Sequence, residues 1–384
     1  MRRLPEFALE SYFARWEFTA RHHLCPSDMQ SMTLGELLAL ATPDQREAWD
    51  QLWLGYTETR GAPALRAAIA GTYDGPQGGL TADDVLVTVG AEEGIFLALQ
   101  ALLGPDDHAV VLTPTYQSLE SVTASLCAVT GVLLEPAPDA AGGWALDPDR
   151  LAASLRPNTR AILLNLPHNP TGYLPTRAVF DAVVDIARSR GIWILSDEVY
   201  RGLERRPEDR LPAIAEAYER GLSIGVLSKA YGLPGLRLGW LACRDRDLLR
   251  RIERLKDYTT ICSPAPSEAL GVIALGARDR ILARNQALIA ANLPLLEAFF
   301  ARHADRFEWQ APAAGCIAYP RYRGAEGVEA FTADVVERSG VLLLPASVYR
   351  STLGPVPADR FRIGFGRTKT PSALAALEAH LAAA

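Results

Sequence analysis

The sequence has few cysteines, and their positions do not suit a cross-linked or zinc-bound framework. The five are odd in number and scattered, and no two form a C-x-x-C pair; they are Cys25, Cys127, Cys243, Cys262 and Cys316. Disulfide-rich secreted domains and zinc sites use regularly spaced cysteines. We therefore expect neither, and we expect a reducing compartment such as the cytoplasm.

Long apolar runs and an excess of basic charge are also missing. No stretch of about 18 apolar residues is present, so no membrane span is expected. The start of the chain carries positive charge without an apolar segment behind it, which predicts no signal peptide. The net charge of −6 gives no basic field for nucleic acid or an anionic membrane. An anionic ligand would therefore need a local pocket.

The composition that is present suits a soluble protein with more than one core. The chain has 384 residues, 49% of them hydrophobic and 22% charged. Strand-like runs at 85–89, 109–112, 161–165, 192–196, 224–227 and 236–242 alternate with helix-like runs at 92–103, 116–129, 177–189 and 211–217. This alternation predicts an α/β fold with a largely parallel sheet and helices on both faces.

The pattern changes after residue 267. Long helices are expected at 268–276 and 280–303, followed by short strands at 307–310, 315–319, 341–344 and 361–364. We expect a large domain over residues 46–280 and a smaller α+β domain built from both chain ends, residues 1–45 and 281–384. Near the amino terminus, Tyr12, Phe13, Trp16 and Phe18 are expected to pack together onto the fold.

One lysine stands where an apolar strand should end. The run 224–227 leads through Ser228 to Lys229 and then into a glycine-rich segment. Strand ends are the usual place for chemistry in an open α/β sheet. Lys229 is either a solvated residue or a buried amine with a lowered pKa that can form a Schiff base. Because most lysines are solvated, other residues must decide between the two.

A second strand end is followed by Gly90, Ala91 and Glu92, where a helix should begin. The free backbone N–H groups at a helix start suit a phosphate group. The alternative is an ordinary tight turn. A glutamate side chain would repel phosphate, so the backbone is the expected ligand at this position.

Two further strand ends carry polar side chains. The run L-N-L-P-H-N-P-T-G fixes Asn169 at the rim of the sheet, either as a turn residue or as a donor to a ligand oxygen. Asp197 follows a buried strand, where an unpaired carboxylate is costly, so it is expected to hold a cationic ring nitrogen or a metal. No other acidic strand end completes a metal site, and we expect none.

Taken in order, these motifs resemble one family. The runs G-A-E-E-G, P-T-Y, H-N-P-T-G, S-D-E-V-Y, S-K-x-x-G-L-P-G-L-R-x-G-W and F-R-I-G-F resemble the class I/II aminotransferases over about residues 50 to 370. The resemblance implies the aspartate aminotransferase fold (fold type I), with a mostly parallel seven-stranded sheet, and pyridoxal 5′-phosphate (PLP) as cofactor. It also implies a homodimer that moves an amino group between an L-amino acid and a 2-oxo acid through a Schiff base on Lys229.

The resemblance also implies roles for single residues. Lys229 would carry the cofactor and shuttle a proton, while Asp197 would pair with the pyridine nitrogen. Asn169 and Tyr200 would bind its phenolic oxygen, and Tyr116 would stack on the ring. The expected phosphate ligands are Gly90, Ala91, Glu92, Ser228 and Arg237, with Tyr56 contributed by the neighbouring subunit. The expected substrate-binding residues are Arg362, which would clamp the α-carboxylate, Asn169 and Gly35.

Two features leave questions open. The family usually has Ser or Thr three residues before the lysine, and Val226 stands there, which puts the strength of phosphate binding in question. The runs S-K-A-Y-G-L-P-G-L-R-L-G-W and M-T-L-G-E-L-L-A-L are similar to those of capreomycidine synthases, which use PLP for elimination and cyclisation. A PLP-dependent lyase or cyclase therefore remains an alternative. A PLP-binding regulator is less favoured, because the stretch before the match is not basic; we expect no nucleic-acid or membrane partner.

Overall fold

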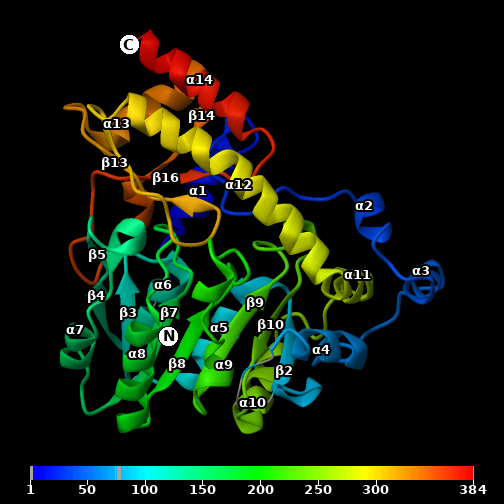
Figure 1. Ribbon diagram of the computed structural model, residues 1–384. Coiled ribbons are helices and arrows are strands. Elements are labelled where there is room, and N and C mark those ends of the chain that lie inside the picture. The colour runs from blue at the N-terminus through cyan, green and yellow to red at the C-terminus, as the bar shows by residue number, and fades with distance from the viewer. Residues whose placement is uncertain (1–2, 74, 76–78, 384) are drawn as a thin grey trace.

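A seven-stranded sheet forms the centre of the computed structural model, which describes residues 3–73, 75 and 79–383 (Figure 1). The strand order is β2-β10-β9-β8-β7-β3-β4. The bounds are β2 (Val85–Thr88), β3 (His108–Thr113), β4 (Ala128–Leu133), β7 (Thr159–Asn165), β8 (Trp193–Asp197), β9 (Gly221–Val226) and β10 (Gly239–Ala242). Only β10 runs antiparallel to its neighbours in this sheet. The predicted α/β fold with a mostly parallel seven-stranded sheet is confirmed.

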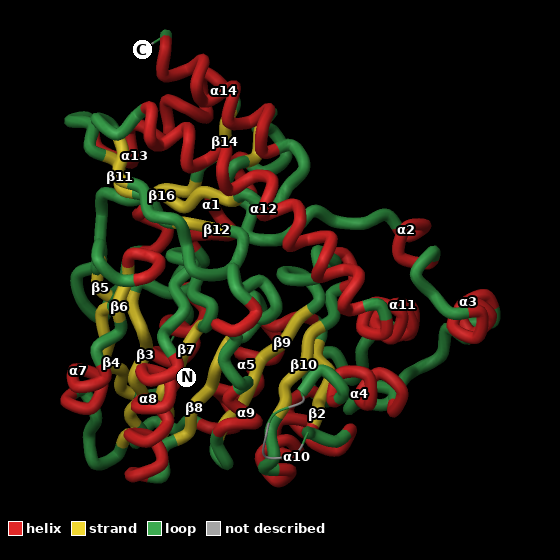
Figure 2. Tube along the Cα trace, in the orientation of Figure 1, coloured by secondary structure: helices red, strands yellow, loops and turns green. Residues whose placement is uncertain are grey.

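Both faces of this sheet are buried, because alternate residues of each strand enter different cores. In β7, Ile162 and Leu164 pack with α8 (Arg177–Arg190), while Ala161 and Leu163 pack on the opposite face. The helices on that opposite face are α5 (Gly90–Leu102), α6 (Gln117–Leu126) and α10 (Arg246–Lys256). α7 (Pro148–Ala153) and α9 (Ile214–Ala217) lie on the α8 side. Figure 2 shows the strands side by side between these helices.

Two sequence predictions about the sheet were wrong in detail. The expected helix at 116–129 ends at Leu126, and the edge strand β4 begins at Ala128. Most β4 residues are only partly buried, so this strand lacks the continuous apolar run that marks the central strands. The expected strand at 236–242 begins only at Gly239, because a 3₁₀ turn occupies Pro234–Leu236.

Segments from the amino-terminal and carboxyl-terminal parts of the chain pack together above the carboxyl ends of the sheet strands (Figure 1). β1 (His22–His23) pairs in parallel with β14 (Val341–Leu342), and β16 (Phe361–Gly364) lies between β12 (Ile317–Ala318) and β15 (Leu344–Pro345). β5 (Glu135–Pro136) pairs with β6 (Trp144–Ala145), and β11 (Phe307–Glu308) pairs with β13 (Arg321–Tyr322). The helices of this part are α1 (Ala8–Trp16), α12 (Arg278–Arg302), α13 (Gly327–Asp334) and α14 (Thr370–Ala382). The expected boundary at residue 280 falls in the first turn of α12, and the division into two domains stays a prediction.

Four further helices lie near one another at one side of the molecule. α2 (Leu34–Leu38) and α3 (Pro43–Asp50) project beside α4 (Pro63–Ala70) and α11 (Ala265–Gly276) (Figure 1).

The aromatic side chains of α1 pack as expected, but Phe18 is 90% exposed, so its predicted place in that cluster was wrong. All five cysteines are described and free. Over the described ranges, no helix combines the length and apolarity needed to cross a membrane.

Candidate active site

A cavity of about 210 Å³ opens at the carboxyl ends of β7, β8 and β9. Its floor comes from the strand ends, and part of its wall comes from Leu9, Glu10 and Phe13 of α1. The structure brings nine of the expected site residues to its lining: Ala91, Glu92, Tyr116, Asn169, Asp197, Tyr200, Ser228, Lys229 and Arg237. These residues are far apart in the sequence and meet because parallel strands end at one edge of the sheet.

The amine of Lys229 points into this cavity from the loop after β9. Its Nζ donates to Ser27 Oγ at 3.0 Å. Burial lowers the pKa of Lys229, and the nearby Asp28 carboxylate opposes part of that shift. A lowered pKa increases the fraction of uncharged amine, which is the nucleophilic form. Ser27 was missed by the sequence analysis, since it lies in an amino-terminal loop with no recognisable motif.

Asp197 ends β8 as a buried carboxylate with little compensation from the protein. Its Oδ1 accepts the Val199 N–H at 3.2 Å. Burial raises the pKa of Asp197 to about 7, although that bond and the charge of Lys229 both lower it. A cationic ring nitrogen beside this carboxylate would favour its charged form. Over the described ranges, no group of three or more His, Cys, Asp or Glu side chains is placed to bind a metal ion.

Two hydroxyl groups of the cavity are buried and lack hydrogen-bond partners in the described protein. They are Tyr200 Oη and Ser228 Oγ. Buried hydroxyl groups are nearly always paired, so these two positions suit the polar atoms of a ligand. A phenolic oxygen near Tyr200 and a phosphate near Ser228 would satisfy both, so the residues present fit PLP.

Arg237 lies over the start of α5. A Cβ built on Gly90 would lie 2.6 Å from Arg237 Nη2, so the guanidinium rests directly against the glycine. The backbone of Gly90 has φ +81°, and that of Arg237 has φ +47°. An exposed guanidinium beside the free N–H groups of a helix start suits a phosphate group.

The Glu92 side chain is held by a hydrogen bond from α6. Its Oε1 accepts a hydrogen bond from Ser118 Oγ at 2.5 Å, and burial raises its pKa. The backbone N–H groups of the helix start, rather than this carboxylate, stay the predicted phosphate ligand. Tyr116 lies beside it, with its ring centroid 5.6 Å from that of Phe7.

Four expected residues are not on the cavity lining: Gly90, Tyr56, Gly35 and Arg362. Tyr56 is 84% exposed, and Gly35 lies on α2, which projects away from the sheet (Figure 1). Arg362 is fully buried next to the cavity, where its Nη1 lies 3.2 Å from Asn169 Oδ1. Val226 does line the cavity, with an apolar side chain where a hydroxyl is usual in the family.

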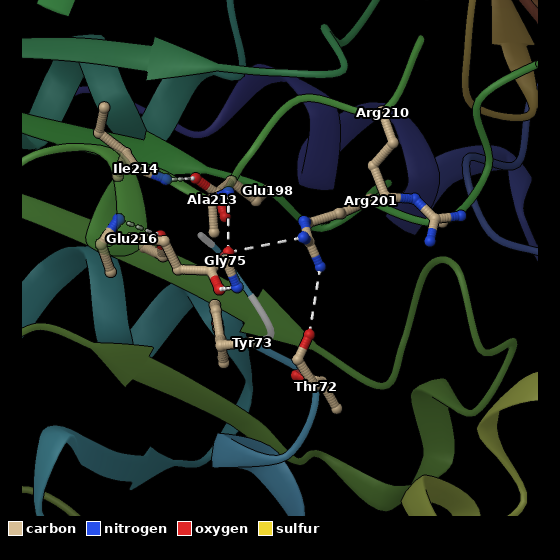
Figure 3. A network of polar contacts seen from close by, with 12 residues as sticks. Thr72, Tyr73, Gly75, Glu198, Arg201, Arg210, Ala213, Ile214 and Glu216 are labelled. Carbon is tan, nitrogen blue, oxygen red and sulfur yellow. Dashed lines mark hydrogen bonds and ion pairs between the residues drawn. The ribbon is translucent and has the colours of Figure 1, made fainter. Parts of the chain in front are cut away.

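A network of polar contacts includes Glu198, the residue after Asp197 (Figure 3). Glu198 Oε1 accepts the Ile214 N–H at 2.8 Å, and burial raises its pKa to about 7. Arg201 lies 3.7 Å from Glu216 and donates to Thr72 O at 3.4 Å. The network therefore fastens α9 and the segment after α4 to the loop that follows β8.

Comparison with known proteins shows the family of this chain. The family model for aminotransferase class I and II matches residues 27–377. The chain belongs to this family. A capreomycidine synthase from Streptomyces vinaceus is 31% identical over 383 residues, which cover 98% of this chain and 94% of that protein.

Solved structures give the same result. A PLP-dependent aminotransferase from Streptococcus suis matches with a TM-score of 0.88 and 30% identity, and the match covers 98% of this chain and 97% of that one. The PLP-dependent cyclase OrfR matches with a TM-score of 0.87 and 28% identity, covering 99% and 98%. The family member described here is a PLP-dependent aminotransferase.

Proposed function

We propose that the protein moves an amino group between an L-amino acid and a 2-oxo acid in the cavity that holds Lys229. The observation that carries the proposal is the pairing, at one cavity, of a lysine with a lowered pKa and a buried carboxylate with a raised pKa. PLP, when bound, supplies an electron sink for the bonds at the substrate Cα. Groups whose pKa values are shifted in opposite directions often do acid–base work.

The chain's own residues would divide the work as follows. Asp197 would hold a proton on the ring nitrogen, while Asn169 and Tyr200 would donate hydrogen bonds to the phenolic oxygen. Ser228, Arg237 and the backbone of Gly90, Ala91 and Glu92 would bind the phosphate, and Tyr116 would cover the ring. The Lys229 amine would take a proton from the substrate Cα and deliver it to C4′ of the cofactor. Arg362 would bind the α-carboxylate.

The test is a donor and acceptor screen with the purified protein and PLP. We expect amino-group transfer from at least one L-amino acid to pyruvate, oxaloacetate or 2-oxoglutarate. The absence of transfer with every pair, in a protein that binds PLP, would overturn the proposal.

Elimination or cyclisation is the second candidate, and the likeness to capreomycidine synthase and to the cyclase OrfR favours it. The two reactions differ in what they need. Transamination without a 2-oxo acid stops after one equivalent of pyridoxamine phosphate, whereas elimination or cyclisation continues. Incubation of the PLP-loaded protein with amino acids alone, L-arginine and its hydroxylated forms included, separates them.

We further propose that the protein works as a cytoplasmic homodimer. The segment after α3 exposes three large apolar side chains, Trp53 (79%), Leu54 (77%) and Tyr56 (84%). Clustered exposed apolar side chains of this size favour a protein interface. A second copy would cover the patch and let Tyr56, and with it Gly35, complete the neighbouring site. Light scattering should give twice the mass of the chain, and Leu54→Asp should shift it toward the single chain.

A further inference from the structure

Tyr349 joins two residues of the proposed site. Its ring is buried, its hydroxyl lies 2.9 Å from Asn169 Oδ1, and Arg362 Nη1 lies 2.6 Å from that hydroxyl. Arg362 Nη1 also lies 3.2 Å from Asn169 Oδ1, which closes a triangle of three hydrogen bonds. Residue 349 belongs to none of the motifs that identify the site from sequence.

The direction of each hydrogen bond follows from the chemistry of the partners. A guanidinium only donates, so the Tyr349 oxygen accepts from Arg362. The single hydroxyl hydrogen of Tyr349 then remains for Asn169, whose atom there must be the carbonyl oxygen. The amide of Asn169 is thereby fixed with its oxygen toward the tyrosine and the arginine.

This arrangement leaves the amide nitrogen of Asn169 free for a ligand. Asn169 lines the cavity, and within the described part of the chain its Nδ2 has no hydrogen-bond partner. The backbone N–H of Asn169 donates to Asn165 Oδ1 at 2.6 Å, and Asn165 Nδ2 donates to the Asp197 carbonyl at 3.0 Å. The donor is therefore held in place from both the side chain and the backbone.

The same contact restrains Arg362. Its Nε and Nη2 donate to the Cys25 carbonyl at 3.1 and 2.9 Å, and Nη1 is shared between Tyr349 and Asn169. Four of its five N–H groups are thus directed by the protein. Removal of the Tyr349 hydroxyl would free one of them and leave the Asn169 amide oxygen held only by the longer Arg362 contact of 3.2 Å.

We propose that Tyr349 is a positioning residue whose hydroxyl orients the Asn169 amide toward the phenolic oxygen of PLP and holds Arg362 for the substrate α-carboxylate. This inference rests on the proposed function. It adds a residue that acts through two others, so that carboxylate binding and polarisation of the cofactor depend on one hydroxyl group.

The chain offers a matched control in Tyr319. Its ring packs edge-on against Tyr349 with centroids 5.6 Å apart, and its buried hydroxyl has no hydrogen-bond partner in the described protein. Tyr319→Phe and Tyr349→Phe each remove one buried oxygen from the same aromatic pair, but only the second breaks the triangle. Thermal unfolding of both apoproteins checks that they fold.

Two measurements test the proposal in PLP-loaded protein. In Tyr349→Phe, the pH titration of the visible band of bound PLP should move to higher pH, because the phenolic oxygen loses a positioned donor. Affinity for 2-aminoisobutyrate, which carries the α-carboxylate but no Cα hydrogen, should fall about 10-fold, the usual effect of one lost hydrogen bond to a charged group. Tyr319→Phe should match the wild type in both.

A Tyr349→Phe protein that matches the wild type in both measurements overturns the proposal, as does a Tyr319→Phe protein that shows equal changes. If Tyr349→Phe does not fold, Tyr349→Met, which also removes the hydroxyl, is measured against the same expectations. Neither measurement requires amino-group transfer, since both compare a variant with the wild type. A donor screen without transfer would therefore contradict the proposed function but not the role of Tyr349.

Discussion

Gly90 and Arg237 touch at the start of α5, where the missing side chain of the glycine makes room for the guanidinium. A Cβ atom at position 90 would lie 2.6 Å from Arg237 Nη2, which is too close. The φ of +81° at Gly90 is also one that other residues rarely adopt. Space and backbone conformation together therefore set the position of Arg237 relative to the helix start.

Gly90→Ala should weaken PLP binding by displacing the Arg237 guanidinium. We expect the dissociation constant for PLP to rise about 10-fold or more, the effect of losing a charge-assisted contact. Equilibrium titration of the apoprotein by fluorescence measures it. Gly235→Ala is the control from the same loop, since a Cβ there meets nothing within 4 Å. Equal PLP affinity in the two variants would contradict the proposed role of Arg237.

Lys229 can be tested directly because the chain has only three lysines, Lys229, Lys256 and Lys369. Borohydride reduction of the PLP-loaded protein should attach the cofactor to Lys229 alone, as read by peptide mass spectrometry. Lys229→Ala should lose the visible band of bound PLP. Its rate of amino-group transfer should fall by at least about 1,000-fold, because the nucleophile and the proton carrier are lost together. Lys369→Ala serves as the control, and a pyridoxyl group on another lysine would refute the assignment.

The apoprotein should lose stability as the pH rises through the range of two buried carboxylates. Burial raises the pKa of Asp197 and Glu198 to about 7 in the folded protein, well above the unfolded values. The folded state then binds more protons than the unfolded state between about pH 4 and pH 7, so the free energy of unfolding falls as the pH rises through that window. The change should be on the order of a few kcal/mol for each group.

Asp197→Asn should remove part of this pH dependence and stabilise the apoprotein at pH 8, while it impairs amino-group transfer. Glu198→Gln should also flatten the profile but retain the visible band of bound PLP, because Glu198 lies outside the cavity lining. Urea unfolding at pH 5.5 and pH 8 measures the pH dependence of stability in both variants. A wild-type apoprotein more stable at pH 8 than at pH 5.5 would argue against neutral carboxyl groups at these positions.

Residues at strand ends could be predicted from the sequence, whereas residues that reach the site from distant segments could not. Asn169, Asp197 and Lys229 follow apolar runs, and parallel strands bring such positions to one edge. Ser27 meets Lys229 across 202 positions, and Tyr349 meets Asn169 across 180. Those contacts depend on how the chain ends close over the sheet, for which no local pattern exists.

The fold shows the same division. The central strands were predictable because both faces are buried and their runs are apolar, while β4 was missed because an edge strand needs no such run. Gly35 and Tyr56 were expected from family resemblance alone, and both lie outside the cavity of the single chain. Their proposed roles depend on a second copy.

We propose that Ser228, rather than Val226, binds the cofactor phosphate on the lysine side of the cavity. Both line it, but only Ser228 presents a hydroxyl, and that hydroxyl is buried without a partner in the described protein. Ser228→Ala should therefore raise the dissociation constant for PLP about 10-fold and leave that for pyridoxal, which has no phosphate, unchanged. Val226→Thr in the Ser228→Ala background adds a hydroxyl group with little change in side-chain volume. It should recover part of the lost PLP affinity. Equal losses for PLP and pyridoxal would show that Ser228 acts on the fold of the loop rather than on the phosphate.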